Sequence, residues 1–262
     1  MAYRLSCRVA AIGLFVLAAA TFATAAELKV LTTPALTEVW KELGPKYEAA
    51  GNKLTIVYAS SGAVAKRAAE GENADLLIST PGGIDGLIGN GKVIGGSNIP
   101  VASSGMGVAV LKGAPKPDIS SSAALKQTLL AARAVAYTDP TSGGASGEHM
   151  AKVLERLGIA SEVNAKAKLG RGVRAGSFVV KGEADIAIQQ IPELRAVDGV
   201  EIIGPLPGDL QNVTTFTAGI PTGSTQPDAA RALIHFLQTP ESAAIISKHG
   251  LDPIPPTKPA KT

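Results

Sequence analysis

Short apolar runs alternate with helical patterns along most of this chain. In its first part, β-branched apolar runs predict strands at 28–31, 54–59 and 74–79. Amphipathic spacing predicts helices at 35–50, 63–70 and 83–90, the first with Pro34 at a favoured initial position. Because short links join strands to helices in alternation, we expect an α/β fold whose mostly parallel sheet is flanked by helices.

A second series of the same kind begins near residue 106. Strands are predicted at 106–111, 135–138, 185–189, 200–203 and 213–220. Helices are predicted at 122–132, 148–157, 174–181, 227–237 and 240–249, and the proline-rich end from Pro253 is expected to be irregular. Two separate series of this kind predict two lobes.

The two lobes should be joined by the strands at 106–111 and 213–220, which can carry the chain out and back. We expect lobe 1 at 27–105 plus 219–262, lobe 2 at 106–218, and hinge closure over a ligand held between them. A single undivided α/β domain is the alternative that the pattern leaves open.

The first 26 residues have the features of a secretory signal peptide. Arg4 and Arg8 accompany an apolar stretch at 9–20, and small residues surround the expected cleavage site near Ala25 or Ala26. The single cysteine, Cys7, lies before that stretch, so we expect neither a lipid anchor nor a disulfide in the mature chain. The sequence thus predicts export to the periplasm, and we expect a monomer.

Charge does not indicate a large charged partner. The chain has 25 Lys and Arg residues against 22 Asp and Glu. This near balance gives no basic footprint for nucleic acid or a membrane surface. The histidines, His149, His235 and His249, lack the spacing of a metal site, and no nucleotide-binding or serine-hydrolase motif is present. We therefore expect no metal and no cofactor.

Four turns that follow apolar runs carry small hydroxylated or glycine residues and lead into helical patterns. They are Thr32-Thr33-Pro34, Ser60-Ser61-Gly62, the segment 142–147 and Gly170-Arg171-Gly172. Helix starts expose unpaired N–H groups at the positive end of the helix dipole, so several such ends converging on one cleft make an anion site. Each hydroxyl could instead be an ordinary helix cap.

Five segments, in this order along the chain, are shared with a known family. They are LKVLTTPAL at 28–36, YASSG at 58–62, ADLLIS at 74–79, TDP at 138–140 and GEADIAI at 182–188. On these segments the chain resembles the periplasmic solute-binding proteins of the molybdate-binding type, over essentially its whole mature length. The resemblance implies a two-lobed, type II periplasmic-binding-protein-like fold. It also implies that Thr33 and Ser61, with Thr32 and Ser60 beside them, contact an oxyanion.

One position departs from that family. Where its lobe 2 site has a tyrosine after the last shared segment, this chain reads Ile188-Gln189-Gln190. Arg171 and Arg174 lie at the fourth turn. Guanidinium groups suit planar carboxylates, whereas neutral donors serve a tetrahedral oxyanion well. The candidate ligand is therefore a small organic polycarboxylate. Its binding set also includes Ser142, Gly144, Ser146 and Gln189.

The chain resembles in particular a branch of this family that acts as an enzyme on such an acid. This resemblance implies a cofactor-free isomerisation of aconitate by an allylic proton shift. Two alternatives remain. The protein could deliver an oxyanion or organic acid to an ABC permease, or it could be a solute sensor that docks on a membrane receptor. Glu148 and His149 open the helix after the glycine turn and are candidate bases, with Arg171 stabilising the developing charge. The plainer interpretation makes Glu148 a first-turn helix residue and His149 a surface residue.

Overall fold

The computed structural model describes residues 26–256, so the expected signal peptide with Cys7 lies outside the described residues except for Ala26. The strands are β1 (Glu27–Thr32), β2 (Lys53–Tyr58), β3 (Leu76–Ser79), β4 (Ile99–Leu111), β5 (Val135–Thr138), β6 (Ala167–Gly170), β7 (Ile186–Gln190), β8 (Val200–Pro205), β9 (Val213–Gly219) and β10 (Asp252–Pro253). The α-helices are α1 (Thr37–Glu48), α2 (Ser61–Ala69), α3 (Pro81–Gly89), α4 (Ser122–Ala131), α5 (Ala145–Leu157), α6 (Ala160–Asn164), α7 (Gly176–Val180), α8 (Ile191–Arg195), α9 (Pro227–Leu237) and α10 (Pro240–Lys248). Short 3₁₀ turns occur at η1 (Pro34–Leu36), η2 (Pro140–Ser142) and η3 (Gly208–Leu210).

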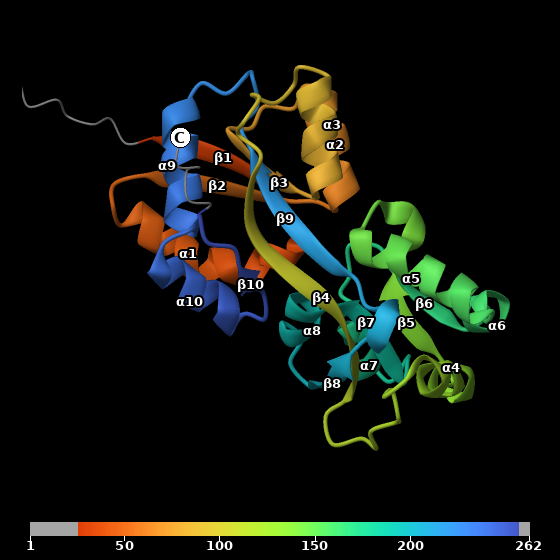
Figure 1. The fold of residues 1–262 in the computed structure, drawn as a ribbon. Helices are drawn as coiled ribbons and strands as arrows, with labels where there is room; N and C mark the ends of the chain where they lie inside the picture. Colours follow the sequence, from red (N-terminus) through yellow and green to blue (C-terminus); the bar gives the residue numbers. More distant parts are fainter. Residues whose placement is uncertain (1–25, 257–262) are drawn as a thin grey trace, which may run out of the picture.

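The strands form two lobes that share one mixed sheet, in the order β2-β1-β3-β9-β4-β7-β5-β6, with β8 and β10 also paired to β4 (Figure 1). In lobe 1, β1 pairs in parallel with β2 and β3, and in lobe 2, β5 pairs in parallel with β6 and β7. The sheet is mixed because β4 and β9, which run between the lobes, are antiparallel to their neighbours. The predicted lobe boundaries fall within β4 and near the end of β9, and they remain a prediction.

Each lobe has apolar clusters on both faces of its half of the sheet. In β1, Val30 packs in a cluster with α1, while its neighbour Leu31 packs in another cluster with α2 and α3. In lobe 2, Val108 and Ala109 of β4 likewise belong to different clusters. Side chains alternate across a strand, so consecutive apolar residues indicate a strand covered on both faces. The two clusters of lobe 1 share no residue with the two clusters of lobe 2, which supports two lobes over one undivided domain.

Several elements differ from the expectation. β4 begins at Ile99 rather than near residue 106, because its first half pairs with β9 and β10 despite its serines. The short elements α6, β6 and α8 were not expected, and Pro253, at the start of the segment expected to be irregular, belongs to β10. These elements are too short to show a clear apolar period.

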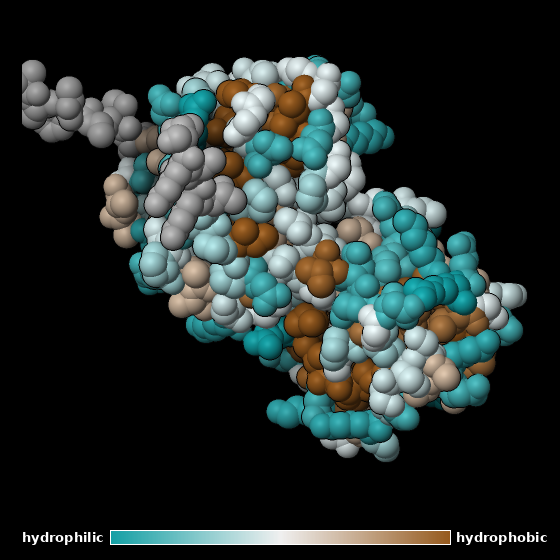
Figure 2. All heavy atoms as spheres, in the orientation of Figure 1, coloured by the Kyte–Doolittle hydropathy of each residue, from teal (hydrophilic) through white to brown (hydrophobic). Residues whose placement is uncertain are grey.

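Hydrophilic and hydrophobic side chains are interspersed over the visible face of both lobes (Figure 2). No helix within residues 26–256 combines the length and the apolar character that crossing a membrane requires.

Candidate functional site

A cleft of about 810 Å³ lies between the two lobes, and all four predicted turns line it. From lobe 1 it is lined by the turn after β1 and the start of α2. From lobe 2 it is lined by the turn before α5, the turn after β6, and the link from β7 into α8. These are the carboxyl ends of parallel strands, where α/β sheets bind their ligands.

Thr33 presents a buried hydroxyl at the cleft wall. Its side chain forms no cap on η1, the residue is 2% exposed, and its Oγ1 has no hydrogen-bond partner among the described residues. A buried hydroxyl without a partner is unfavourable. Because this oxygen has almost no accessible surface, the contact between the Thr33 side chain and a ligand stays a prediction. The neighbouring Thr32 Oγ1 is also buried and unpartnered in that range, but Thr32 does not line the cleft.

Ser60 and Gly62 bring the two lobes into direct contact. The Ser60 hydroxyl caps α2 by accepting from Ala63 N at 3.3 Å and donates across the cleft to the Ser142 carbonyl at 2.7 Å. The Gly62 N–H donates to the Gly143 carbonyl at 2.9 Å. The described conformation is therefore closed at this point. Ser61 is buried and also lines the cleft.

The turn before α5 supplies the lobe 2 hydroxyls. Ser142 Oγ donates to the Asp139 carbonyl at 2.6 Å, and Ser146 Oγ donates to Thr138 Oγ1 at 3.0 Å. Gly144 lines the cleft with them, directly before the first residue of α5. The cleft wall is thus the positive end of a 13-residue helix, which favours a bound anion.

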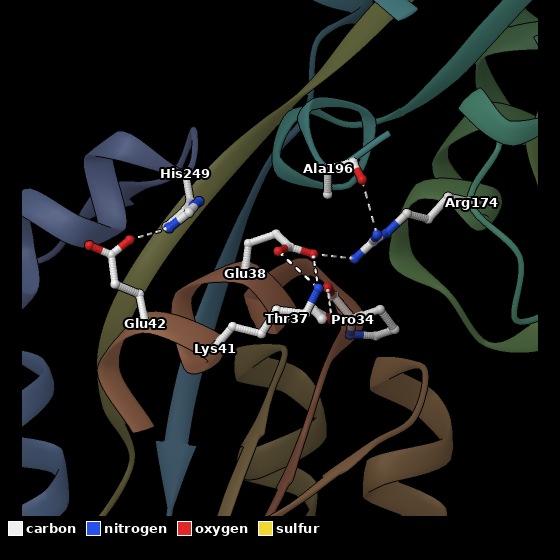
Figure 3. Close-up of polar contacts among 8 residues, drawn as sticks. All are labelled: Pro34, Thr37, Glu38, Lys41, Glu42, Arg174, Ala196 and His249. Carbon is white, nitrogen blue, oxygen red and sulfur yellow. Dashed lines mark hydrogen bonds and ion pairs between the residues drawn. The ribbon is translucent and has the colours of Figure 1, made fainter. Parts of the chain in front are cut away.

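Both arginines of the fourth turn line the cleft, and both already contact carboxylates. Arg171 pairs with the buried Asp139, although 76% of the arginine side chain stays exposed. A backbone hydrogen bond from Thr141 and the Arg171 guanidinium together lower the pKa of Asp139. Arg174 instead reaches lobe 1, where Nη2 lies 3.0 Å from Glu38 Oε1 (Figure 3).

Gln189 lines the cleft as expected. Glu193, which was not among the residues predicted from the sequence, lines it too. Gln189 Nε2 donates to Glu193 Oε1 at 2.9 Å. Burial, as the largest influence, raises the pKa of Glu193 to about 7, although the Arg174 charge and the Gln189 hydrogen bond act in the opposite direction. A raised carboxyl pKa in a cleft is typical of proton-transfer groups.

The candidate bases Glu148 and His149 do not line the cleft. Glu148 is exposed on the first turn of α5, and His149 Nε2 contacts the Leu210 carbonyl at 2.8 Å. Successive residues of a helix point in different directions, so a helix that starts at the cleft turns these two side chains away from it. The residues 26–256 also contain no group of three or more His, Cys, Asp or Glu side chains arranged to hold a metal ion.

Comparisons with known proteins agree with this architecture. The family model described as bacterial extracellular solute-binding protein matches residues 28–252. An aconitate isomerase from Pseudomonas sp. is 36% identical over 235 residues, which are 87% of this chain and 88% of that protein. The molybdate-binding protein ModA from Rhodobacter capsulatus is 25% identical over 231 residues, 87% of this chain and 89% of that one.

A solved structure shows the same fold. The periplasmic molybdate-binding protein of Azotobacter vinelandii matches with a TM-score of 0.71 and 20% identity, covering 88% of this chain and 100% of that one. The predicted α/β periplasmic-binding-protein-like fold and the predicted family resemblance are thereby confirmed. This chain belongs to the family of bacterial extracellular solute-binding proteins.

Proposed function

We propose that this protein is a periplasmic aconitate isomerase, which interconverts trans-aconitate and cis-aconitate by a cofactor-free allylic proton shift in the interlobe cleft. The observation that carries the proposal is the 36% identity to an aconitate isomerase over 87% of the chain. Family membership by itself supports binding of a small molecule, so the catalytic step rests on this relative.

The cleft has features that suit a tricarboxylate. Its volume of about 810 Å³ lies within the usual range for small-molecule sites. The turn that contains Thr33 and the start of α2 line it from lobe 1, while the start of α5 and the exposed side chain of Arg171 line it from lobe 2. Donors on both lobes can hold separate carboxylates of one acid, which favours closure around the ligand.

The proposed location is the periplasm, where a mature monomer acts on a dissolved acid. The signal-peptide features of the first 26 residues support export, as does membership in an extracellular family. We propose neither nucleic acid nor a cofactor as a partner.

The alternative is a binding protein that delivers a molybdate-like oxyanion or a polycarboxylate to an ABC permease. The 25% identity to a molybdate-binding protein favours it. The two functions share a cleft and differ in whether a group in that cleft moves a proton of the ligand.

The test uses the mature protein, freed of metal with a chelator. Purified protein is incubated with each aconitate isomer, the products are separated by chromatography, and calorimetry with trans-aconitate and molybdate runs in parallel. The proposal expects conversion from both directions and measurable binding of trans-aconitate. Tight molybdate binding without any conversion would assign the protein to the transport class.

A further inference from the structure

Glu193 is a carboxyl group at the cleft wall that forms no ion pair with any residue between 26 and 256. It lies in the first turn of α8, directly after β7, and Pro192 occupies the start of that helix. The chain therefore leaves a buried strand and places an acidic side chain at the cleft within three residues of the strand end, Gln190. The side chain is partly buried.

Gln189 fixes the position of this carboxyl group. Its Oε1 accepts from the Ala175 N–H at 2.8 Å, so its Nε2 must point the other way, toward Glu193 and Thr138. Nε2 lies 2.9 Å from Glu193 Oε1 and 3.3 Å from Thr138 Oγ1. Within the described residues the second carboxyl oxygen, Oε2, makes no hydrogen bond. One oxygen is thus held in place while the other can exchange a proton with a ligand.

The surroundings allow both the protonated and the ionised form of the Glu193 carboxyl group to be populated near neutral pH. Burial raises its pKa to about 7, and the opposing charge of Arg174 is shared with Glu38 and the Ala196 carbonyl. A group that takes a proton and then returns it works best when neither form is strongly favoured. Glu148 and His149 do not line the cleft and have no such access to a ligand.

Building on the function proposed above, we propose that Glu193 is the catalytic residue that moves the proton from one end of the allylic system of aconitate to the other. The Glu193 carboxylate removes a proton from the methylene carbon, and the C–H electron pair spreads over the allylic carbons and their carboxylates. The protonated Glu193 then gives a proton to the former vinyl carbon, which becomes the new methylene, and it donates a deuteron instead when the carboxyl group has exchanged with heavy water first. The double bond has moved by one carbon, and no oxidant, reductant or water is consumed.

The test compares the wild type with Glu193→Gln and with Glu155→Gln, a matched change on the exposed face of α5. Three quantities are measured for each: the isomerisation rate, deuterium incorporation into the methylene group of trans-aconitate in heavy water by NMR, and the thermal shift with trans-aconitate. We expect Glu193→Gln to lose about 10²- to 10⁴-fold in both rates while keeping the thermal shift. Glu155→Gln should match the wild type.

The outcomes separate the two proposals. A wild type that neither isomerises nor exchanges deuterium overturns the proposed function, and the role of Glu193 with it. An active wild type together with a Glu193→Gln variant that keeps more than about a tenth of both rates overturns the role of Glu193 alone. If the Glu193→Gln variant fails to fold, the Glu193→Asp variant tests the role of Glu193 instead. Its shorter carboxylate is expected to slow both reactions, and full rates would contradict the proposal.

Discussion

Arg174 and Glu38 join the two lobes across the cleft, with the guanidinium Nη2 3.0 Å from the carboxylate Oε1 (Figure 3). Arg174 also donates to the Ala196 carbonyl at 3.2 Å, and Glu38 also pairs with Lys41 on its own helix, so the bridge is supported from both sides. Desolvation raises the pKa of Glu38, but the hydrogen bonds from Lys41 and Arg174 outweigh it and leave that pKa below its ordinary value.

The Glu38→Gln variant should bind its ligand more weakly, because the closed conformation loses an ion pair that the open one does not make. We expect the dissociation constant for trans-aconitate to rise about threefold to tenfold, the effect of about 1 kcal/mol. Calorimetry measures the affinity. Asp228→Asn is the matched control, because it removes an exposed ion pair with Arg231 on α9, away from the cleft, and an equal loss there would contradict a role in closure.

The Gly62→Ala variant should hold the lobes apart. A Cβ atom at Gly62 would lie 3.0 Å from the Gly143 carbonyl oxygen and 3.2 Å from its Cα, and these backbone atoms cannot rotate away as the end of a side chain could. We expect KM to rise about tenfold or more, with little change in melting temperature.

Gly86→Ala is the control for that variant. Gly86 also lies in a helix, α3, but an added Cβ meets nothing within 4 Å. This substitution should leave KM unchanged and stabilise the protein by about 0.5–1 kcal/mol through helix propensity. X-ray scattering with and without ligand then shows whether Gly62→Ala alone prevents compaction, and normal compaction would contradict the steric argument.

The raised pKa of Glu193 predicts a stability penalty at high pH. Between the ordinary glutamate pKa near 4.5 and about 7, the folded protein binds more protons than the unfolded chain at this site, so the unfolding free energy falls as pH rises. Glu193→Gln removes that penalty, and the variant should exceed the wild type in stability at pH 8 by at most about 3 kcal/mol, but not at pH 4. Denaturant unfolding at both pH values checks this difference, and equal differences would contradict it.

Ionisation of Glu193 should determine how the isomerisation rate rises with pH on the acidic side of the pH profile. A base must be ionised, so kcat/KM is expected to rise with pH and to level off above about 7. Arg174 is the charged side chain that influences Glu193 within the cleft, and Arg174→Gln should move the midpoint upward because its charge lowers that pKa. A midpoint that stays in place would show that a different group limits the rate.

Arg171→Ala should weaken carboxylate binding far more than Lys66→Ala. Loss of the guanidinium removes one cation from the cleft and leaves the Asp139 carboxylate unpaired, which would repel an anionic ligand. Lys66 is 75% exposed, pairs loosely with Glu70 at 3.8 Å and does not line the cleft. About a tenfold loss of affinity is expected for Arg171→Ala and none for Lys66→Ala. Similar small effects in both would remove Arg171 from the binding site.

Much of the fold could be predicted because burial leaves a local pattern. In α9, the buried residues Ala230, Leu233, Ile234 and Leu237 repeat at helical spacing, and the helix was predicted with the bounds that the structure has. The four turns were recognisable for a similar reason, since a strand end followed by small residues and a helix start is a local feature. Their convergence on one cleft follows from the sheet topology.

The proton-transfer group could not be predicted because its properties arise from distant residues. In sequence, Glu193 is one acidic residue after Pro192, an ordinary composition for a first helical turn. Its environment depends on Ala175 and Thr138, which orient Gln189 from two other segments. The available signal was the pair Gln189-Gln190 ending an apolar strand directly before an acidic helix start. Glu148 and His149 had the expected residue types but not the orientation.

The measurement that tests the central claim most directly is an NMR time course of trans-aconitate and, separately, of cis-aconitate with the metal-free mature protein. The account predicts that both reactions approach the same ratio of isomers without added cofactor. If a folded protein that shows a thermal shift with trans-aconitate left both acids unchanged, the cleft would bind the acid without catalysing its isomerisation, and the account would be contradicted.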